Sequence, residues 1–154
     1  MRIETEARFA CSHPNIPVHR VAIIGGGFAG ASLARSLTLA ARVEPGDIVV
    51  FEPHQRLGAG LAYDACDPAM RLNVAAHRMR ALPEAPDAFL SFLRQSGCLA
   101  RDPDAIRGTD VYARRADFAA FMEETMRPLL DDGTVIHARD RVDSVHRSAE
   151  GWQI

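Results

Sequence analysis

A short apolar run followed at once by three glycines constrains this chain more than any other feature. Val21 to Ile24 are all apolar, Gly25, Gly26 and Gly27 come next, and residues 31–41 are rich in alanine and leucine. A continuous apolar run is typical of a parallel strand buried on both faces, and alanine and leucine favour helices. The sequence therefore predicts a strand, a tight turn and a helix in direct succession.

The glycine spacing gives this turn a chemical meaning. Gly25, Gly27 and Gly30 fit G-x-G-x-x-G. In such a turn the first glycine allows a sharp exit from the strand, the second allows close approach of phosphates, and the third allows tight helix packing. The free N–H groups at the start of the helix, where Phe28 and Ala29 stand, attract anions. Because the motif lies between a strand and a helix, we predict that residues 25–30 bind the pyrophosphate of a dinucleotide.

An acidic residue follows the second apolar run. Ile48 to Phe51 come after the turn residues 45–47, and Glu52 ends the run. A carboxylate at the end of the second strand can accept both hydroxyls of the adenosine ribose. It would also repel a 2′-phosphate, so NADP is disfavoured here. We include Glu52 and the adjacent Pro53 in the predicted site. The alternative is that the glycines form only a tight turn and that Glu52 is a solvated residue at the end of a strand.

The rest of the chain is less regular. Residues 53–86 contain several glycines and prolines and indicate long loops. We expect helices at residues 87–96, capped by Gly97, and at residues 115–126, ended or kinked by Pro128. On the first helix, Leu33, Leu37 and Ala40 form the expected apolar stripe. On the last helix the residues expected to point inward are Phe118, Phe121, Met122 and Met126.

Beyond Gly133 the pattern changes to alternation with a period of two. Residues 135–138 and 142–146 alternate as half-buried strands do, and residues 152–154 begin another strand after a turn. Because the chain stops in the middle of this pattern, we expect a truncated domain, or one fragment of a longer protein. Residues 1–18 lack such patterning and are predicted to form a flexible N-terminal tail.

Charge and cysteine content narrow the classes of partner. The net charge is −2, and Lys and Arg form no run, so neither nucleic acid nor membrane is an expected partner. No apolar stretch is long enough for a membrane span.

The three cysteines, Cys11, Cys66 and Cys98, are scattered along the chain, which is typical of reduced thiols in a cytoplasmic protein. No H-E-x-x-H motif and no Cys-x-x-Cys pair occurs, so we predict no metal site.

Four segments together resemble a bacterial family of FAD/NAD(P)-binding proteins. They are residues 23–30, 57–63, 71–74 and 86–93. A more distant similarity runs to flavin-dependent N-hydroxylating monooxygenases. The resemblance implies an FAD domain, with NAD(P) bound by a second domain. It also suggests that Gly58 and Gly60 let a loop approach the flavin and that Asn73 forms a hydrogen bond with the flavin ring or ribityl chain. The alternative is that Gly58 and Gly60 form a plain turn and that Asn73 is an ordinary loop residue.

Other polar side chains are weaker candidates. Arg71, Arg78, Arg114 and Arg115 are candidates for contact with phosphate, against the commoner alternative of solvated arginines. Among the histidines only His77, beside Arg78 in the family-like loop, merits a test as an acid or base. No serine lies in a nucleophile elbow, which argues against a hydrolase.

The sequence thus predicts an α/β fold. We expect a Rossmann-type parallel sheet with flanking helices and a C-terminal antiparallel β excursion, forming one FAD/NAD(P)-binding domain over residues 19–154. The expected function is the FAD-binding domain of a flavin-dependent oxidoreductase, with a small-molecule substrate that the sequence does not identify. Two alternatives remain: a non-catalytic module that binds NAD(H) or FAD, and an NAD-dependent dehydrogenase domain.

Overall fold

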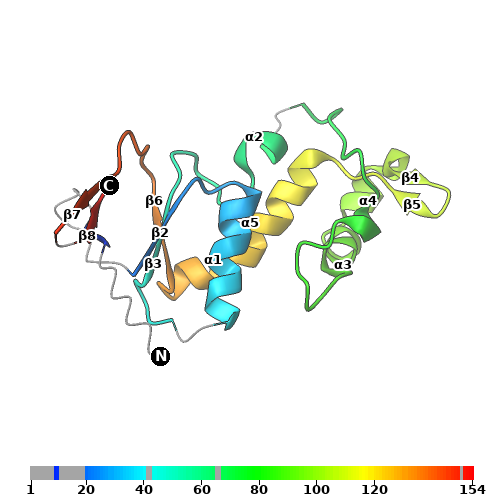
Figure 1. Ribbon diagram of the computed structural model, residues 1–154. Coiled ribbons are helices and arrows are strands. Elements are labelled where there is room, and N and C mark those ends of the chain that lie inside the picture. Colours follow the sequence, from blue (N-terminus) through cyan, green and yellow to red (C-terminus); the bar gives the residue numbers. More distant parts are fainter. Residues whose placement is uncertain (1–8, 11–19, 41–42, 65–66, 150) are drawn as a thin grey trace. The chain divides into compact units, whose positions relative to one another are not determined.

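The computed structural model describes residues 9–10, 20–40, 43–64, 67–149 and 151–154 (Figure 1). The chain forms two compact units. We call Met1–Gly58 together with Met126–Ile154 the sheet unit, and Ala59–Thr125 the inserted unit. Of the predicted tail, only β1 (Phe9–Ala10) belongs to the described residues, and it pairs in parallel with β8 (Gly151–Gln153). The rest of that tail, like Cys11 and Cys66, lies outside them.

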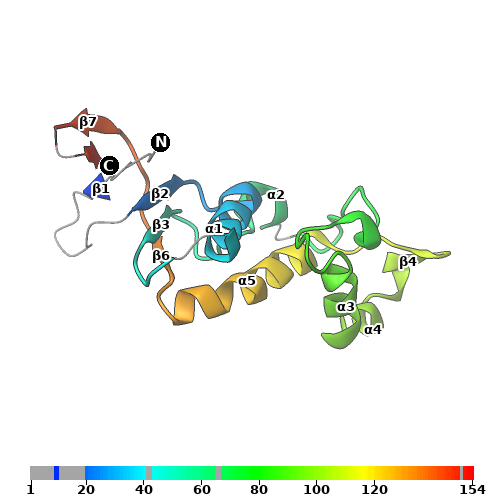
Figure 2. The same ribbon diagram turned by 60° about the horizontal axis from the view of Figure 1, so that its bottom comes forward.

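A three-stranded parallel sheet organises the sheet unit. Its strands are β2 (Val21–Ile24), β3 (Ile48–Phe51) and β6 (Val135–Ala138), in the order β2-β3-β6. The three strands lie side by side in both ribbon views (Figure 1, Figure 2). Helix α1 (Phe28–Ala40) connects β2 to β3 and packs on both. This is the first half of a Rossmann-type sheet, in which successive strands are added to one side of the first strand. The predicted α/β class is confirmed.

The burial of these elements corrects two details. All four residues of β3 are buried, but in β2 only Ile23 is, and Ile24 is 55% exposed. The prediction that β2 is buried on both faces is therefore wrong. β2 is an edge strand of the described sheet, so fewer neighbouring side chains cover its two faces than cover those of the central strand β3.

The predicted stripe on α1 is wrong as well. Leu33, expected to point inward, is 50% exposed, and Ala40 is exposed. The fully buried positions are Ala31 and Ala34. Small side chains let the helix axis approach the sheet closely, so α1 docks through its alanines and turns the larger leucine outward.

The C-terminal segment contains the expected antiparallel hairpin in a different place. Strands β7 (His146–Ser148) and β8 pair antiparallel, which confirms a small antiparallel excursion. Residues 142–145 are not a strand, although the alternation predicted one. β6 is also not part of the excursion, because it pairs in parallel with β3 along its whole length. The alternation of apolar residues did not distinguish a parallel strand from a hairpin strand.

Short elements make up the inserted unit. They are α2 (Gly60–Tyr63), η1 (Ala76–Arg78), α3 (Ala88–Gln95), α4 (Cys98–Arg101), η2 (Pro103–Ala105), β4 (Ile106–Arg107) and β5 (Asp110–Val111). For the described residues of the range 53–86, which leave out residues 65–66, the predicted loop character is confirmed apart from two short helical turns. Helix α3 ends as expected, with Gly97 in the left-handed region at φ +71°. Phenylalanine rings form the core: those of Phe89 and Phe118 meet edge to face, with centroids 5.0 Å apart.

Helix α5 (Arg115–Asp131) leads back to β6. Its residues Phe118, Phe121, Met122 and Met126 are buried, as predicted. We predicted that Pro128 ends or kinks this helix. The helix does not end there, because it continues to Asp131. Proline removes one helical donor; its own carbonyl still accepts the N–H of Asp132 at 3.1 Å, so the last turn closes.

Candidate dinucleotide site

The glycine turn is fixed by contacts that a side chain would block. The N–H of Gly25 donates to the carbonyl oxygen of Phe51 at 2.9 Å, and Gly25 has φ +96°, which permits the sharp exit from β2. At Gly30, a Cβ atom would lie 1.9 Å from the carbonyl oxygen of Gly25. The turn and the first helical turn of α1 are thus in direct contact, which is the tight packing predicted for Gly30.

Gly26, to which the G-x-G-x-x-G spacing assigns no role, is also closely surrounded by other residues. A Cβ atom at Gly26 would lie 2.4 Å from Cδ2 of Leu57 and 2.6 Å from Cβ of Glu52. Its carbonyl oxygen accepts the N–H of Gly58 at 2.7 Å. The segment after β3 therefore folds back onto the glycine turn, and the triple glycine in the sequence was the only sign of this close approach.

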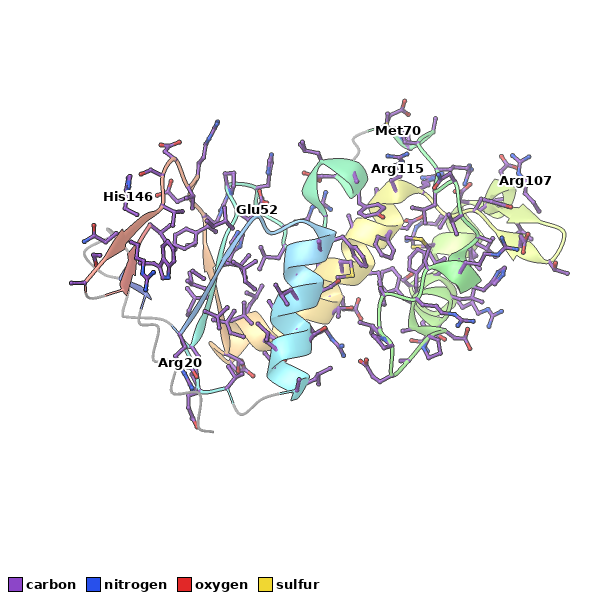
Figure 3. The ribbon with its side chains drawn as sticks, in the orientation of Figure 1. Arg20, Glu52, Met70, Arg107, Arg115 and His146 are labelled. Atoms are coloured by element: carbon purple, nitrogen blue, oxygen red, sulfur yellow. The ribbon has the colours of Figure 1, made fainter. Side chains whose placement is uncertain are left out.

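Glu52 links the two parts of the site. It directly follows β3 and is only 7% exposed. Its Oε2 accepts the N–H of Gly26 at 2.9 Å, and its Oε1 accepts the N–H of His54 at 3.0 Å. Nδ1 of His54 lies 2.6 Å from the same Oε1. Figure 3 shows Glu52 at the end of β3, where the chain leaves β2 for α1.

These hydrogen bonds keep Glu52 ionised. Burial by itself raises the pKa of the Glu52 carboxyl, but the backbone N–H and side chain of His54, together with the N–H of Gly26, outweigh it and lower the pKa below its usual value. Hydrogen bonds donated to the charged form have this effect. A buried, ionised carboxylate at the carboxyl end of a parallel strand is therefore part of the protein before any ligand binds.

Free donors lie beside this carboxylate. Within the part of the chain that the structure describes, the backbone N–H groups of Gly27, Ala29 and Gly30 have no hydrogen bond partner. The helical hydrogen bonds of α1 begin with the N–H of Ala31, which donates to Gly27 at 3.0 Å. Unpaired donors at a helix N-terminus, with the positive end of the helix dipole, form an anion site. The residues present thus fit a pyrophosphate.

The same edge of the sheet has a hollow. Phe51, Ile154 and the loop of residues 140–144 line a volume of about 160 Å³. Phe51 ends β3 and the loop follows β6, so the hollow lies at the carboxyl ends of the strands, where ligands of open parallel sheets bind. His137 lies nearby in β6, with Nε2 2.9 Å from the carbonyl oxygen of Glu52.

The other predicted residues are distributed over both units. Gly25, Gly27, Phe28, Ala29, Gly30, Glu52 and Pro53 belong to the sheet unit, and the structure brings them together. Gly60 and Asn73 belong to the inserted unit. Their roles toward a flavin stay predictions. His54, which the sequence did not single out, belongs with the first group, since it stands two positions after Glu52 and reaches its carboxylate.

The arginine candidates have structural partners. Arg71 makes two hydrogen bonds to Asp102, at 2.8 and 2.9 Å, and Nε of Arg114 makes a third at 3.0 Å. Arg115 donates to the carbonyl oxygen of Ala62 at 3.1 Å. Arg71 and Arg114 therefore have a structural partner, and their contact with a phosphate stays a prediction. Both arginines contact the carboxylate of Asp102, which is buried at 6% exposure, while their own side chains are partly exposed.

Among the described residues, His77 and Cys98 add no second centre. Nδ1 of His77 lies 3.6 Å from Oδ1 of Asp110, an exposed ion pair. Cys98 is a buried free thiol. Among the residues that the structure describes, no group of His, Cys, Asp and Glu is arranged to hold a metal ion. No described helix is long and apolar enough to cross a membrane.

A parallel strand, a glycine turn, a helix and a second strand that ends in a buried acid define a Rossmann-type dinucleotide-binding domain. The chain belongs to the FAD-NAD(P)-binding family, whose family model matches residues 22–154. No curated protein matches the chain. The match begins inside β2 and runs to the last residue, so it covers both the glycine turn and Glu52.

Proposed function

We propose that this chain is the FAD-binding part of a flavin-dependent oxidoreductase. The observation that carries the proposal is the hydrogen bond between Gly26 N–H and Glu52, which joins the phosphate-binding turn to the acid expected at the ribose. The family match supports FAD or NAD(P). The resemblance of residues 57–63 and 71–74 to flavoproteins, and the more distant one to flavin-dependent N-hydroxylating monooxygenases, favours FAD.

In this proposal the residues of the sheet unit bind and orient the cofactor. The N–H groups of Gly27, Ala29 and Gly30 donate to the pyrophosphate, and Phe28 and Pro53 line the approach to it. The hollow beside Phe51 receives the adenosine half. When bound, FAD supplies the redox chemistry by accepting electrons from NAD(P)H and passing them to an acceptor.

Glu52 has a defined capacity to accept further hydrogen bonds. Both the backbone N–H and the imidazole of His54 contact Oε1, whereas Oε2 accepts one hydrogen bond, from the N–H of Gly26. A carboxylate oxygen has two lone pairs, so one ribose hydroxyl can donate to Oε2 without disturbing the turn. A second hydroxyl reaches Oε1 if the imidazole of His54 turns away, which its 50% exposed side chain allows.

We expect Glu52→Gln to weaken dinucleotide binding about tenfold, since a hydrogen bond to a charged group contributes about 1.5–3 kcal/mol. The matched control is His54→Ala, which removes the imidazole from Oε1 but keeps the backbone N–H of residue 54, and it should leave the affinity equal to or higher than that of the wild type. Calorimetric titration of each purified variant with FAD, and separately with NADH, gives the comparison. Thermal unfolding of the unliganded proteins separates lost folding from lost binding.

Two outcomes would count against the proposal. If FAD does not bind while NADH binds stoichiometrically, the chain is an NAD(H)-binding module or a dehydrogenase domain instead. If folded Glu52→Gln binds FAD as tightly as the wild type, Glu52 does not contact the cofactor.

A further inference from the structure

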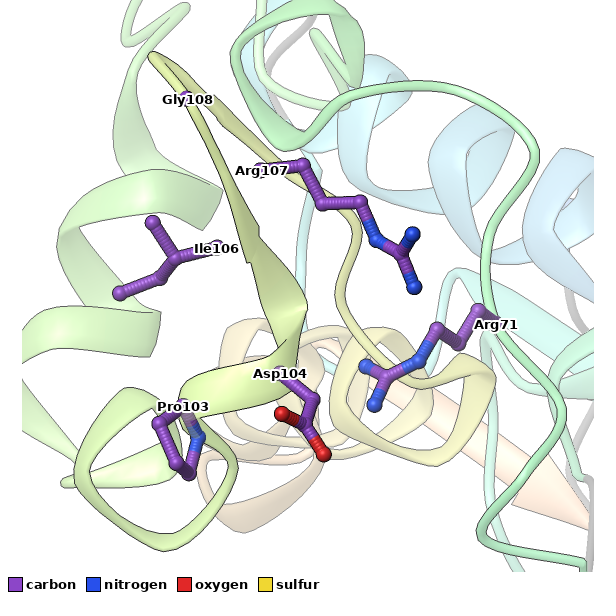
Figure 4. A pocket seen from close by; sticks show the side chains of 6 residues that line it. All are labelled: Arg71, Pro103, Asp104, Ile106, Arg107 and Gly108. Atoms are coloured by element: carbon purple, nitrogen blue, oxygen red, sulfur yellow. The ribbon is translucent and has the colours of Figure 1, made fainter.

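A polar hollow in the inserted unit lies outside the dinucleotide site. Its volume is about 580 Å³, and it is lined by Arg71, Pro103, Asp104, Ile106, Arg107 and Gly108. Figure 4 shows that the guanidinium groups of Arg71 and Arg107 both extend into this opening, with the carboxylate of Asp104 beside them. The volume is in the range of small-molecule sites, about 300–1,000 Å³.

Arg71 is held rigidly on one side of the hollow. Its two terminal nitrogens bind Asp102, and NH1 also donates to the carbonyl oxygen of Tyr112 at 3.0 Å. The backbone next to Arg71 is fixed by a hydrogen bond from the N–H of Leu72 to the carbonyl oxygen of Ala113 at 2.9 Å. Within the described residues, Nε of Arg71 has no partner. Because the orientation is fixed in advance, a ligand would not have to order this side chain.

Arg107 faces Arg71 without a partner of its own. It lies on β4, which pairs with β5 through Arg107 and Asp110, and the hairpin turns at Gly108 with φ +62°. The Arg107 side chain is exposed, and among the described residues it makes no hydrogen bond or ion pair. Two guanidinium groups in one opening repel each other, so an anion between them would be bound favourably.

The charges around the hollow set the charge of the ligand. Among the residues that line the hollow, Arg71 and Arg107 are positively charged and Asp104 is negatively charged, which leaves a net charge of +1. A single negative charge neutralises this set. A doubly charged phosphate would overcompensate it and would be repelled by Asp104. A carboxylate also matches the planar fork of a guanidinium group.

We propose that this hollow binds the carboxylate of a small organic acid between Arg71 and Arg107. Neither arginine takes part in the proposed FAD contacts. The carboxylate oxygens accept hydrogen bonds from Nε of Arg71 and from the guanidinium of Arg107.

The test is a titration of ¹⁵N-labelled protein with sodium propionate at constant ionic strength, with sodium phosphate and sodium chloride in parallel. We expect a saturable shift of the Nε–H resonances of Arg71 and Arg107 and of the Gly108 amide at millimolar propionate. Arg107→Gln should weaken this binding at least about tenfold, because a charge-assisted hydrogen bond is lost. Arg94→Gln, an exposed arginine on α3, is the matched control and should bind as the wild type does.

Three results would overturn the proposal. Shifts that grow linearly and equally with all three salts would mean that no site exists. Saturation by phosphate but not by propionate would show that the carboxylate assignment is wrong. Unchanged binding by folded Arg107→Gln would remove Arg107 from the site.

Discussion

Replacing Gly30 by alanine should lower the free energy of unfolding by about 3 kcal/mol and abolish measurable dinucleotide binding. The new Cβ atom would lie 1.9 Å from the carbonyl oxygen and 3.0 Å from the carbonyl carbon of Gly25. Both are backbone atoms, and the N–H of Gly25 itself donates a hydrogen bond to the carbonyl oxygen of Phe51 at 2.9 Å. The overlap cannot be relieved by rotating a side chain, so the cost should be at the upper end of the usual 1–3 kcal/mol for overpacking.

The matched control for this substitution is Gly25→Ala. A Cβ atom at Gly25 would meet nothing within 4 Å, but the residue has φ +96°. Its cost is therefore backbone strain alone, about 1–2 kcal/mol. Urea denaturation of both variants provides the comparison. If Gly30→Ala is no less stable than Gly25→Ala, the contact between the turn and α1 does not restrict position 30.

Asp102→Ala should be the second strongly destabilising substitution. Removing the carboxylate leaves Arg71 and Arg114, which are 26% and 35% exposed, without their common partner. Breaking a buried ion pair costs about 3–5 kcal/mol; because both arginines reach solvent, we expect the lower end, about 3 kcal/mol. Asp104→Ala, in an exposed residue two positions later, should change stability by less than about 0.5 kcal/mol.

The same cluster predicts a dependence of stability on pH. The hydrogen bonds from Arg71, opposed by burial and assisted by the charges of Arg71 and Arg114, hold the pKa of Asp102 below its usual value. The unfolded pKa is about 3.9, so the stabilisation is complete above that pH and is lost as the pH falls through the lower, folded pKa. The stability difference between the wild type and Asp102→Asn should therefore shrink as the pH falls below about 4. A difference independent of pH would contradict the ionic origin.

Local patterns predicted the elements that carry the dinucleotide site. The apolar run before the glycines and the run that ends at Glu52 are features of neighbouring residues, and the structure contains both. The contact of Gly26 with Leu57 and Glu52 was not predictable in this way. It depends on how the segment after β3 folds back, and no periodicity encodes that path.

Long-range pairing explains the remaining differences. Arg71 and Asp102 are separated by 31 positions, so their spacing gives no sign that they form an ion pair. The exposure of Ile24 depends on which strands lie beside β2, and its apolar character alone suggested burial. His54 was closer to being predictable, because a histidine two positions after a carboxylate can reach it within one turn of the chain.

The central claim is that residues 25–30 and Glu52 form one dinucleotide site. The most direct test follows the backbone amide resonances of ¹⁵N-labelled protein during titration with FAD. We expect saturable shifts concentrated at Gly25, Gly26, Gly27, Phe28, Ala29, Gly30, Glu52 and His54, with the amides of β4 and β5 unmoved. Saturable binding of FAD that leaves the amides of residues 25–30 and of Glu52 unchanged would contradict the claim.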